Sequence, residues 1–256
     1  MSELLISHLA DHLILIPGGA ETTRSFYDEQ KWISSDYKMS NPGRKNNLKE
    51  IRSTIDLEPF QLLRVPVTTD LYGFVMGGRA VLSDEGLPVV NVSWYDAINF
   101  CNSLSKAVGL DPCYITDVPT GQIHCGWKKN GFRLPTEAEW QHACRAGSMK
   151  YQYGTLEDIA WFEENSNGSI QKVGEKAPNQ WGLYDMLGNV WEWCWNLYDE
   201  KRYGPYRAFR GGSWAESARC CGATCRRRSH PSFKIDDLGF RIAKRGNCRT
   251  PCPPFA

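Results

Sequence analysis

Glycine and proline interrupt the second half of this chain every few residues, and this pattern restricts the fold more than any other feature. Beyond Gly147 the interruptions stand at Gly154, Gly168, Gly174, Pro178, Gly182 and Gly188. Segments this short do not hold long helices or strands, yet their buried backbone groups still need hydrogen-bond partners. The ten tryptophans offer N–H donors on large apolar rings. The sequence therefore predicts a loop-rich second half that is held together by side-chain hydrogen bonds.

Two helices are expected before this region. After Trp94, apolar residues recur at helical spacing at Ala97, Ile98, Cys101, Leu104 and Ala107. Ser93 is suited to be the N-cap of this helix, which we expect to end before Gly109. Thr136 begins the second helix, because Glu139 follows three residues later as in a capping box. The buried face of the second helix would contain Ala138, Trp140 or Gln141, Ala143 and Cys144.

Short strands are expected around these helices. Apolar or β-prone runs that end at turn residues predict strands at Leu13–Ile16, within 55–67, at 89–93, at 131–135 and as one hairpin arm within 114–123. Residues 20–54 are polar and contain an Asn-Pro-Gly turn at 41–43, which favours a long irregular surface segment. Trp191, Trp193 and Trp195 alternate like one face of a strand, and we expect them in the core.

Charge and length exclude several classes of protein. The 30 Lys and Arg residues against 29 Asp and Glu residues give a net charge of +1, which offers no electrostatic attraction for nucleic acid or an anionic membrane. The 256 residues are enough for one domain with a sizeable core. Residues 1–9 lack the basic start of a signal peptide. We therefore expect either a cytoplasmic protein or a chain from which an export signal was removed.

Ten cysteines are present, and none of them lies in the first hundred residues. The chain is too long for a small disulfide scaffold, and it has no CxxC pair that would indicate a zinc ribbon. Cys221, Cys225 and His230 carry metal-binding side chains, but no second ligand pair has suitable spacing. Cys248 and Cys252 form a local bridge or none. Five more are expected as buried small hydrophobic residues, namely Cys101, Cys113, Cys125, Cys144 and Cys194.

Five segments together carry a family resemblance. They read Pro-Val-Val-Asn-Val-Ser-Trp-Tyr-Asp-Ala at 88–97, Gly-Phe-Arg-Leu-Pro-Thr-Glu-Ala-Glu-Trp at 131–140, Trp-Gly-Leu-Tyr-Asp-Met-Leu-Gly-Asn-Val-Trp-Glu-Trp at 181–193, Phe-Arg-Gly-Gly-Ser-Trp at 209–214 and Leu-Gly-Phe-Arg at 238–241. In this order they resemble the formylglycine-generating enzyme (sulfatase-modifying factor) family over residues 13–245. The resemblance implies one α+β domain, residues 1–256, with a C-type lectin fold of the formylglycine-generating-enzyme subtype and little regular secondary structure.

Some members of this family oxidise a substrate cysteine to formylglycine with two cysteines, the first just after the Arg-Gly-Gly-Ser-aromatic motif and the second five residues later. Here Cys221 matches the second position, but Glu216 occupies the first. A carboxylate is a hard ligand and does not replace a thiolate on Cu(I). Cys220 adjoins Cys221, so the two are not expected to face one site. We therefore expect no catalytic residue and no copper. An oxidase that acts on a cysteine of a sulfatase-like substrate is the alternative.

Another branch, the sulfoxide synthases, takes its iron site from a separate histidine-bearing domain, and the five histidines here form no metal-ligand run. Non-catalytic members include the variable proteins of diversity-generating retroelements, which mutate adenines. An Asn codon then becomes many residue types but not Lys, Glu, Gln, Met or Trp. In 215–237 an Ala-Arg-x-Cys frame remains at 218–221, whereas unrelated residues stand where such relatives hold Asn. Only Glu216 and Lys234 in this window belong to the five excluded types.

The resemblance therefore implies a non-enzymatic receptor protein with a variable region at about 210–241. The expected ligand-binding residues are Ala215, Glu216, Ser217, Cys220, Gly222, Thr224, Cys225, Arg227, Ser229, His230, Ser232, Phe233, Ile235 and Asp236. Phe233 and Ile235 would be apolar anchors, and Arg227, His230 and Asp236 polar contacts. The expected ligand is an unidentified protein or surface ligand, not nucleic acid. The resemblance also implies display on the cell surface as a lipoprotein, through an anchor that is absent from this chain.

The segment from Asp185 to Glu192 resembles the family's calcium-binding loop. By that resemblance the carboxylates of Asp185 and Glu192 and the carbonyls of Gly188 and Val190 would hold a structural Ca²⁺ ion, which takes hard oxygen ligands. The alternative is that the two carboxylates satisfy buried backbone N–H groups or arginines instead.

Overall fold

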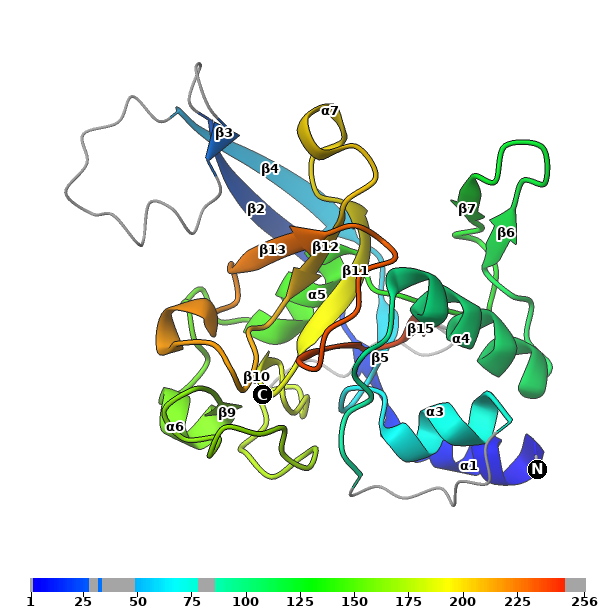
Figure 1. Cartoon of the computed structure of the whole chain (residues 1–256), viewed down its shortest axis with the longest axis horizontal. Helices are drawn as coiled ribbons and strands as arrows, with labels where there is room; N and C mark the ends of the chain where they lie inside the picture. The colour runs from blue at the N-terminus through cyan, green and yellow to red at the C-terminus, as the bar shows by residue number, and fades with distance from the viewer. Residues whose placement is uncertain (1, 28–31, 34–48, 78–85, 247–256) are drawn as a thin grey trace.

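The structure is a computed structural model that describes residues 2–27, 32–33, 49–77 and 86–246 (Figure 1). The turn expected at 41–43 and the cysteines Cys248 and Cys252 lie outside these residues. In the described part of the chain, no helix is both long enough and apolar enough to cross a bilayer.

The second half of the chain is built around a four-stranded sheet with the order β13-β12-β11-β14. The strands are β11 (Trp191–Leu197), β12 (Arg207–Arg210), β13 (Arg226–Ser229) and β14 (Leu238–Phe240). β12 pairs antiparallel with β11 and β13, and β14 joins β11 in parallel. The other elements of this half have two to four residues each, which is the low content of regular structure that the glycine pattern predicts; they are α6 (Leu156–Ile159), β9 (Ala160–Trp161), β10 (Leu187–Gly188), α7 (Glu200–Tyr203) and the 3-10 helix η1 (Ala218–Cys220).

A second four-stranded sheet joins segments from both ends of the described chain. It has the order β1-β5-β15-β8, with all neighbours antiparallel. Its strands are β1 (Leu13–Ile16), β5 (Phe60–Leu63), β15 (Ala243–Arg245) and β8 (Phe132–Arg133). The strands expected at the positions of β1, β5 and β8 are confirmed. The hairpin arm expected over 114–123 is shorter than predicted: β6 (Tyr114–Thr116) is one arm, and β7 (Ile123–Cys125), which starts at the end of that range, is the other.

The strand expected at 89–93 is wrong. Asn91 has a φ of +57°, which interrupts an extended conformation. The backbone N–H groups of this stretch bond to two different segments instead of one ladder: Val89 donates to Val67 at 2.8 Å and Asn91 donates to Ile235 at 3.0 Å.

The two expected helices begin where their caps predict. In α4 (Trp94–Ala107), Ser93 Oγ accepts from the Asp96 N–H at 3.1 Å, and Asp96 returns a bond to the Ser93 N–H at 2.9 Å. In α5 (Glu137–Arg145), Thr136 and Glu139 form the same reciprocal box. The expected buried face of α5 is confirmed, and Glu137, Glu139 and Arg145 are buried with it. Two further helices are α1 (Ser2–His12) and α3 (Thr69–Val75).

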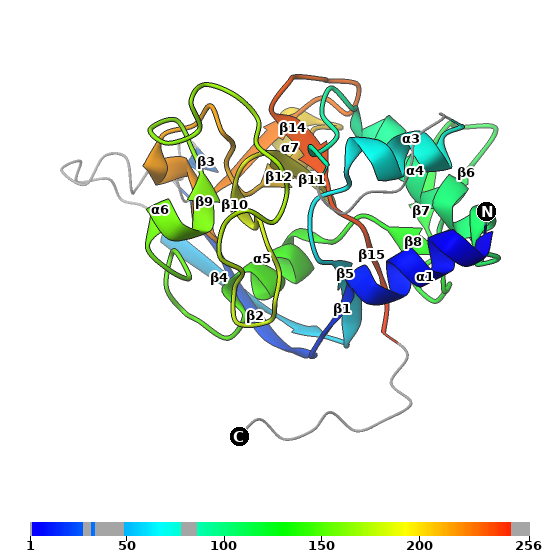
Figure 2. The ribbon, with the colours of Figure 1, turned by 90° about the horizontal axis from the view of Figure 1, so that it is seen from below.

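The irregular segment expected over residues 20–54 is wrong in its described parts. β2 (Gly19–Tyr27) pairs antiparallel with β4 (Lys49–Leu57) along its whole length, and β3 (Trp32–Ile33) pairs with the far end of β2. The ribbon formed by β2 and β4 covers α5. Helix α5 therefore lies between this ribbon and the β13-β12-β11-β14 sheet (Figure 2). Glu21 of β2 makes this contact, because it accepts hydrogen bonds from Gln141 at 2.6 Å and Arg145 at 2.5 Å.

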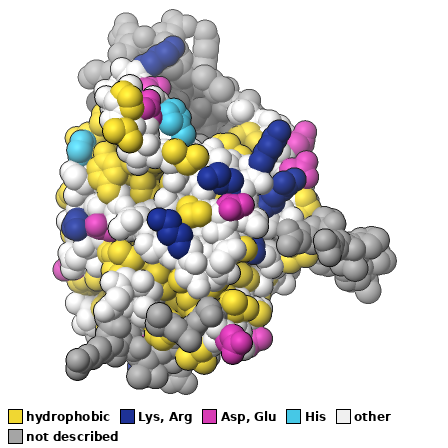
Figure 3. Space-filling view, turned by 90° about the vertical axis from the view of Figure 1, so that its right-hand side faces the viewer, with side chains coloured by type: hydrophobic (Ala, Val, Ile, Leu, Met, Phe, Trp, Pro, Cys, Tyr) yellow, Lys and Arg dark blue, Asp and Glu magenta, His cyan; other side chains and the backbone are white. Residues whose placement is uncertain are grey.

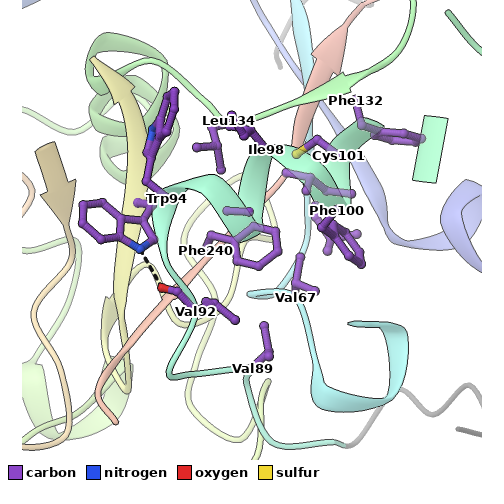
Figure 4. Packing of buried hydrophobic residues seen from close by; sticks show 14 of the residues in the cluster. Val67, Val89, Val92, Trp94, Ile98, Phe100, Cys101, Phe132, Leu134 and Phe240 are labelled. Carbon is purple, nitrogen blue, oxygen red and sulfur yellow. Dashed lines mark hydrogen bonds between the residues drawn. The ribbon is translucent and has the colours of Figure 1, made fainter. Parts of the chain in front are cut away.

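Tryptophan side chains tie the core to the backbone of neighbouring segments. One hydrophobic cluster lies between α4, the loop before it and the β13-β12-β11-β14 sheet, which we call the main sheet (Figure 4). Within it, Trp193 Nε1 donates to the carbonyl of Val92 at 3.0 Å, and Trp94 Nε1 donates to the carbonyl of Cys194 at 3.0 Å. Trp191 and Trp193 are fully buried as expected, whereas Trp195 is only partly buried.

Candidate functional site: the surface of residues 215–237

Residues 215–237 leave the Arg-Gly-Gly-Ser turn, form η1, run along the edge of the main sheet as β13 and return through a loop to β14 (Figure 1). Buried side chains fix the backbone of this segment, and we call these buried residues the frame. Arg210 Nη1 donates to the carbonyls of Ala223 and Cys225, each at 3.2 Å. Ser213 Oγ donates to Asp237 Oδ2 at 2.7 Å. The middle and the end of the segment are therefore fixed by residues that a ligand does not reach.

Eleven of the fourteen predicted contact residues reach the surface. The exposed ones are Ala215, Arg227, His230, Ser232, Phe233, Ile235 and Asp236. The half-buried ones are Glu216, Ser217, Thr224 and Ser229. They lie on four parts of the segment: just before η1, in the turn between η1 and β13, along β13, and in the loop 230–236.

The structure corrects the prediction at Cys220, Gly222 and Cys225, which are buried and offer too little side-chain surface to form a ligand contact; Cys220 is 7% exposed and Cys225 is 2% exposed. At Gly222 the reason is steric, because a Cβ atom there would lie 1.9 Å from Cζ of Tyr151. The Tyr151 ring is itself held by a hydrogen bond from its hydroxyl to the Arg219 carbonyl. Position 222 therefore belongs to the frame and does not tolerate replacement in the way that a binding position would.

The loop 230–236 sits on the beginning of α4. The Trp94 N–H donates to the Pro231 carbonyl at 3.0 Å, and Lys234 Nζ lies 2.7 Å from Asp96 Oδ2. With the loop packed in this way, Phe233 is 39% exposed and Ile235 is 40% exposed. Two large apolar side chains thus remain in contact with solvent while the backbone beneath them is hydrogen-bonded.

Aromatic residues outside the segment extend the same surface, although they are not among the residues predicted from the sequence. Tyr95 lies in the first turn of α4, next to Trp94, which bonds the loop 230–236, and it is 44% exposed. Tyr206 packs edge to face against His230, with ring centroids 6.1 Å apart, and the Arg228 guanidinium lies 3.7 Å from the centre of the Tyr203 ring. The sequence could have indicated Tyr95. It directly follows Trp94, the buried first residue of a capped helix, and consecutive residues of a helix point to different sides.

The positions that correspond to the catalytic cysteines of the oxidases do not form a thiol pair. Glu216 is paired with Arg227, whose Nη2 donates to Glu216 Oε2 at 2.8 Å. Cys221 is fully buried, and burial raises the pKa of its thiol to about 12. A protonated thiol beside an ion-paired carboxylate lacks the two soft thiolates that Cu(I) chemistry requires.

The two carboxylates among the predicted calcium ligands, Asp185 and Glu192, accept hydrogen bonds from other protein groups and do not fit a calcium ion. Both oxygens of Glu192 accept from the Arg241 guanidinium, at 2.8 and 3.1 Å, and Oε2 also accepts from Trp140 Nε1 at 2.8 Å. Asp185 Oδ2 accepts from the Gly174 N–H at 2.7 Å. A cation here would face the positive guanidinium of Arg241, and Ca²⁺ needs six to eight oxygens free to coordinate it. These contacts match the alternative in which the carboxylates satisfy arginine and backbone groups.

Elsewhere in the described residues, no three His, Cys, Asp or Glu side chains are arranged to hold a metal ion. This includes Cys221, Cys225 and His230, because His230 lies on the surface and hydrogen-bonds Ser232 while both cysteines are buried.

The chain resembles known proteins over most of its length. Residues 6–246 match the sulfatase-modifying factor enzyme 1-like domain. The chain is 28% identical to the chaperone protein LppX of Paenibacillus barcinonensis, over 92% of this chain and 90% of that protein. It is 32% identical to the inactive C-alpha-formylglycine-generating enzyme 2 of Mus musculus, over 65% of this chain and 52% of that one.

Among solved structures, the Treponema denticola variable protein 1 superposes with a TM-score of 0.74 and 30% identity, and covers 91% of this chain and 95% of its own. The structure of CarF superposes with a TM-score of 0.67 and 26% identity, over 92% of this chain and 98% of its own. The α+β fold expected from the sequence motifs is therefore confirmed. The chain belongs to the family of sulfatase-modifying factor enzyme 1-like domains and has the C-type-lectin-like fold of the formylglycine-generating enzymes.

Proposed function

We propose that this chain is a non-enzymatic ligand-binding protein, whose surface over residues 215–237 is varied by a retroelement while its frame stays fixed. The observation that carries the proposal is the separation of the two sets of residues. The frame side chains Arg210, Ser213 and Asp237 are buried and hydrogen-bonded to the segment. Seven of the predicted contact positions are exposed and outside this network. The likeness to the Treponema denticola variable protein 1 supports the same proposal.

The exposed set suits a protein ligand. Phe233, Ile235 and Tyr95 offer apolar and aromatic area, which is the usual content of interface hot spots. Arg227, Lys234 and Asp236 add charges of both signs around them. Charges of both signs favour recognition of a partner by local complementarity more than by long-range attraction. The side of the molecule that lies at the right in Figure 1 is also mixed in charge, because basic and acidic side chains are interspersed on it without a broad area of one sign (Figure 3). Display at the cell surface through an anchor is part of the proposal.

A displayed library tests the proposal. The codons of the seven exposed positions are randomised, and the variants are selected for binding to a purified protein such as lysozyme. We expect binders that differ from the parent only at these positions and that melt within a few degrees of it, because exposed substitutions usually change stability by only about 0.5 kcal/mol. A library of equal size at Arg210, Ser213 and Asp237 is the matched control, and it should yield few folded chains.

Two results would contradict the proposal. One is general loss of folding in the exposed-position library, which would show that these residues are structural. The other is turnover of a cysteine-containing sulfatase peptide in the presence of copper that Cys221→Ala abolishes. This second result would favour the oxidase alternative.

A further inference from the structure

Two thiols meet beneath the variable surface, and they are not the pair that the oxidase motif indicates. Cys220 and Cys225 belong to the hydrophobic cluster of α4 and the main sheet, whereas Cys221 points into the separate cluster around Trp140. The side chains of Cys220 and Cys225 are within hydrogen-bonding reach of each other. A tight turn allows this approach, because the Cys225 N–H donates to the Gly222 carbonyl at 2.9 Å.

The surroundings of Cys220 favour its thiolate. Arg227 Nη2 lies 3.6 Å from Cys220 Sγ. The hydrogen bond with the Cys225 thiol lowers the pKa of Cys220 to about 7, although burial and the Glu216 carboxylate act in the opposite direction. A neighbouring guanidinium is a known means of making a cysteine reactive at neutral pH. Cys220 is 7% exposed and Cys225 is 2% exposed, so a reagent from solvent reaches Cys220 first.

We propose that Cys220 and Cys225 are a redox-sensitive dithiol that closes into a disulfide when the protein meets a low-molecular-weight disulfide such as oxidised glutathione. The Cys220 thiolate attacks one glutathione sulfur, forms a mixed disulfide and releases one glutathione thiolate. Cys225 then gives its proton to solvent and attacks Cys220 Sγ, which releases the second glutathione. One glutathione disulfide is reduced as the two protein thiols are oxidised.

The closed pair would fix the turn that connects η1 to β13. Thr224 lies in this turn, and the Glu216–Arg227 ion pair spans its two sides. The conformational freedom of these three surface residues would then depend on the redox state of the compartment. The proposal does not need the ligand-binding function, because the two thiols meet whether or not a ligand exists.

Mass spectrometry of the full chain tests this proposal. The protein is equilibrated in glutathione buffers of increasing oxidised fraction, its free thiols are alkylated, and it is digested with trypsin. Cleavage after Arg219 and Arg226 releases the three cysteines at 220, 221 and 225 in one peptide. We expect this peptide to lose two alkylation sites and two hydrogen masses in oxidising buffer, in the parent and in Cys221→Ser. Cys220→Ser and Cys225→Ser should lose the internal disulfide.

Arg227→Gln should slow mixed-disulfide formation at Cys220 several-fold at neutral pH, whereas Arg219→Gln, an exposed control in the same segment, should not. The parent, Arg227→Gln and Arg219→Gln proteins keep all their thiols, so their results stand even if a cysteine variant fails to fold. The proposal is overturned if the parent peptide stays fully alkylated in the most oxidising buffer. It is also overturned if Cys221→Ser alone prevents the disulfide.

Discussion

At the scale of single residues, the frame depends on a buried ion pair that links four segments of the chain. Arg241 and Glu192 are both 0% exposed, and Arg241 also donates to the carbonyls of Leu63 and Tyr184. Removal of one partner from such a pair leaves an uncompensated buried charge. Arg241→Met should therefore lower the free energy of unfolding by about 3–5 kcal/mol in a urea titration. Arg245→Met removes an exposed arginine of β15 and should change it little. Equal stabilities of the two variants would contradict this role of Arg241.

Asp185 gives the stability a defined dependence on pH. Burial raises the pKa of its carboxyl to about 6, above its ordinary value of 3.8. Between these two values the folded chain binds more protons than the unfolded chain, so stability falls as the pH rises through this window. Asp185→Asn should remove that slope and be more stable than the parent near pH 7. Thermal melts of both proteins between pH 4 and 7 measure it, and parallel curves would contradict the assignment.

Calcium bound at the same loop would reverse this result, because a bound cation keeps Asp185 ionised. Because Glu192 is paired with Arg241, we expect that this loop binds no calcium. Excess EDTA should therefore leave the melting temperature unchanged. The measurement is a pair of melts with EDTA and with added Ca²⁺. A stabilisation that saturates with Ca²⁺ and disappears in Asp185→Asn would contradict this expectation. It would support the calcium site that the sequence resemblance implies.

At the scale of elements, the caps show which helix boundaries the sequence specifies. The Thr136 side chain accepts from the Glu139 N–H at 3.1 Å, whereas Thr155, which stands at the N-cap of α6, makes no such bond. Thr136→Ala should therefore cost about 1 kcal/mol of unfolding free energy. Thr155→Ala is the matched control and should cost less. Similar losses in both variants would mean that the measured effect does not come from the cap.

Element prediction succeeded where the signal is local and failed where the partner is remote. Ser93 and Thr136 specify their helices through residues three positions away, and β1 is a continuous apolar run. The β2–β4 ribbon was missed because its strands are mostly polar, and strand formation depends on the partner and the packed face more than on the residues themselves. The pair of Glu192 and Arg241 is 49 residues apart, so no spacing rule reveals it.

At the scale of the whole molecule, the segment 215–237 combines exposed positions with residues that belong to the core, such as Cys221 and Cys225. Family motifs predicted where this surface begins and ends, and its position between frame residues follows from them. They did not predict that Gly222 lies against Tyr151, or that Cys220 and Cys221 enter different clusters. Both features depend on the packing of the turn before β13 against Tyr151. This contact joins residues about 70 positions apart in the sequence, so no local pattern predicts it.

The most direct test of the central claim is to sequence the DNA that flanks the gene. We predict a reverse transcriptase gene and a near-copy of the coding segment for residues 210–241 that differs only at adenines. The differences should fall in codons for exposed positions such as Phe233, Ile235 and His230, and should spare those for Arg210, Gly222 and Asp237. The absence of such a copy, or differences concentrated in the codons of the buried frame, would contradict the proposal of a replaceable binding surface on a fixed scaffold.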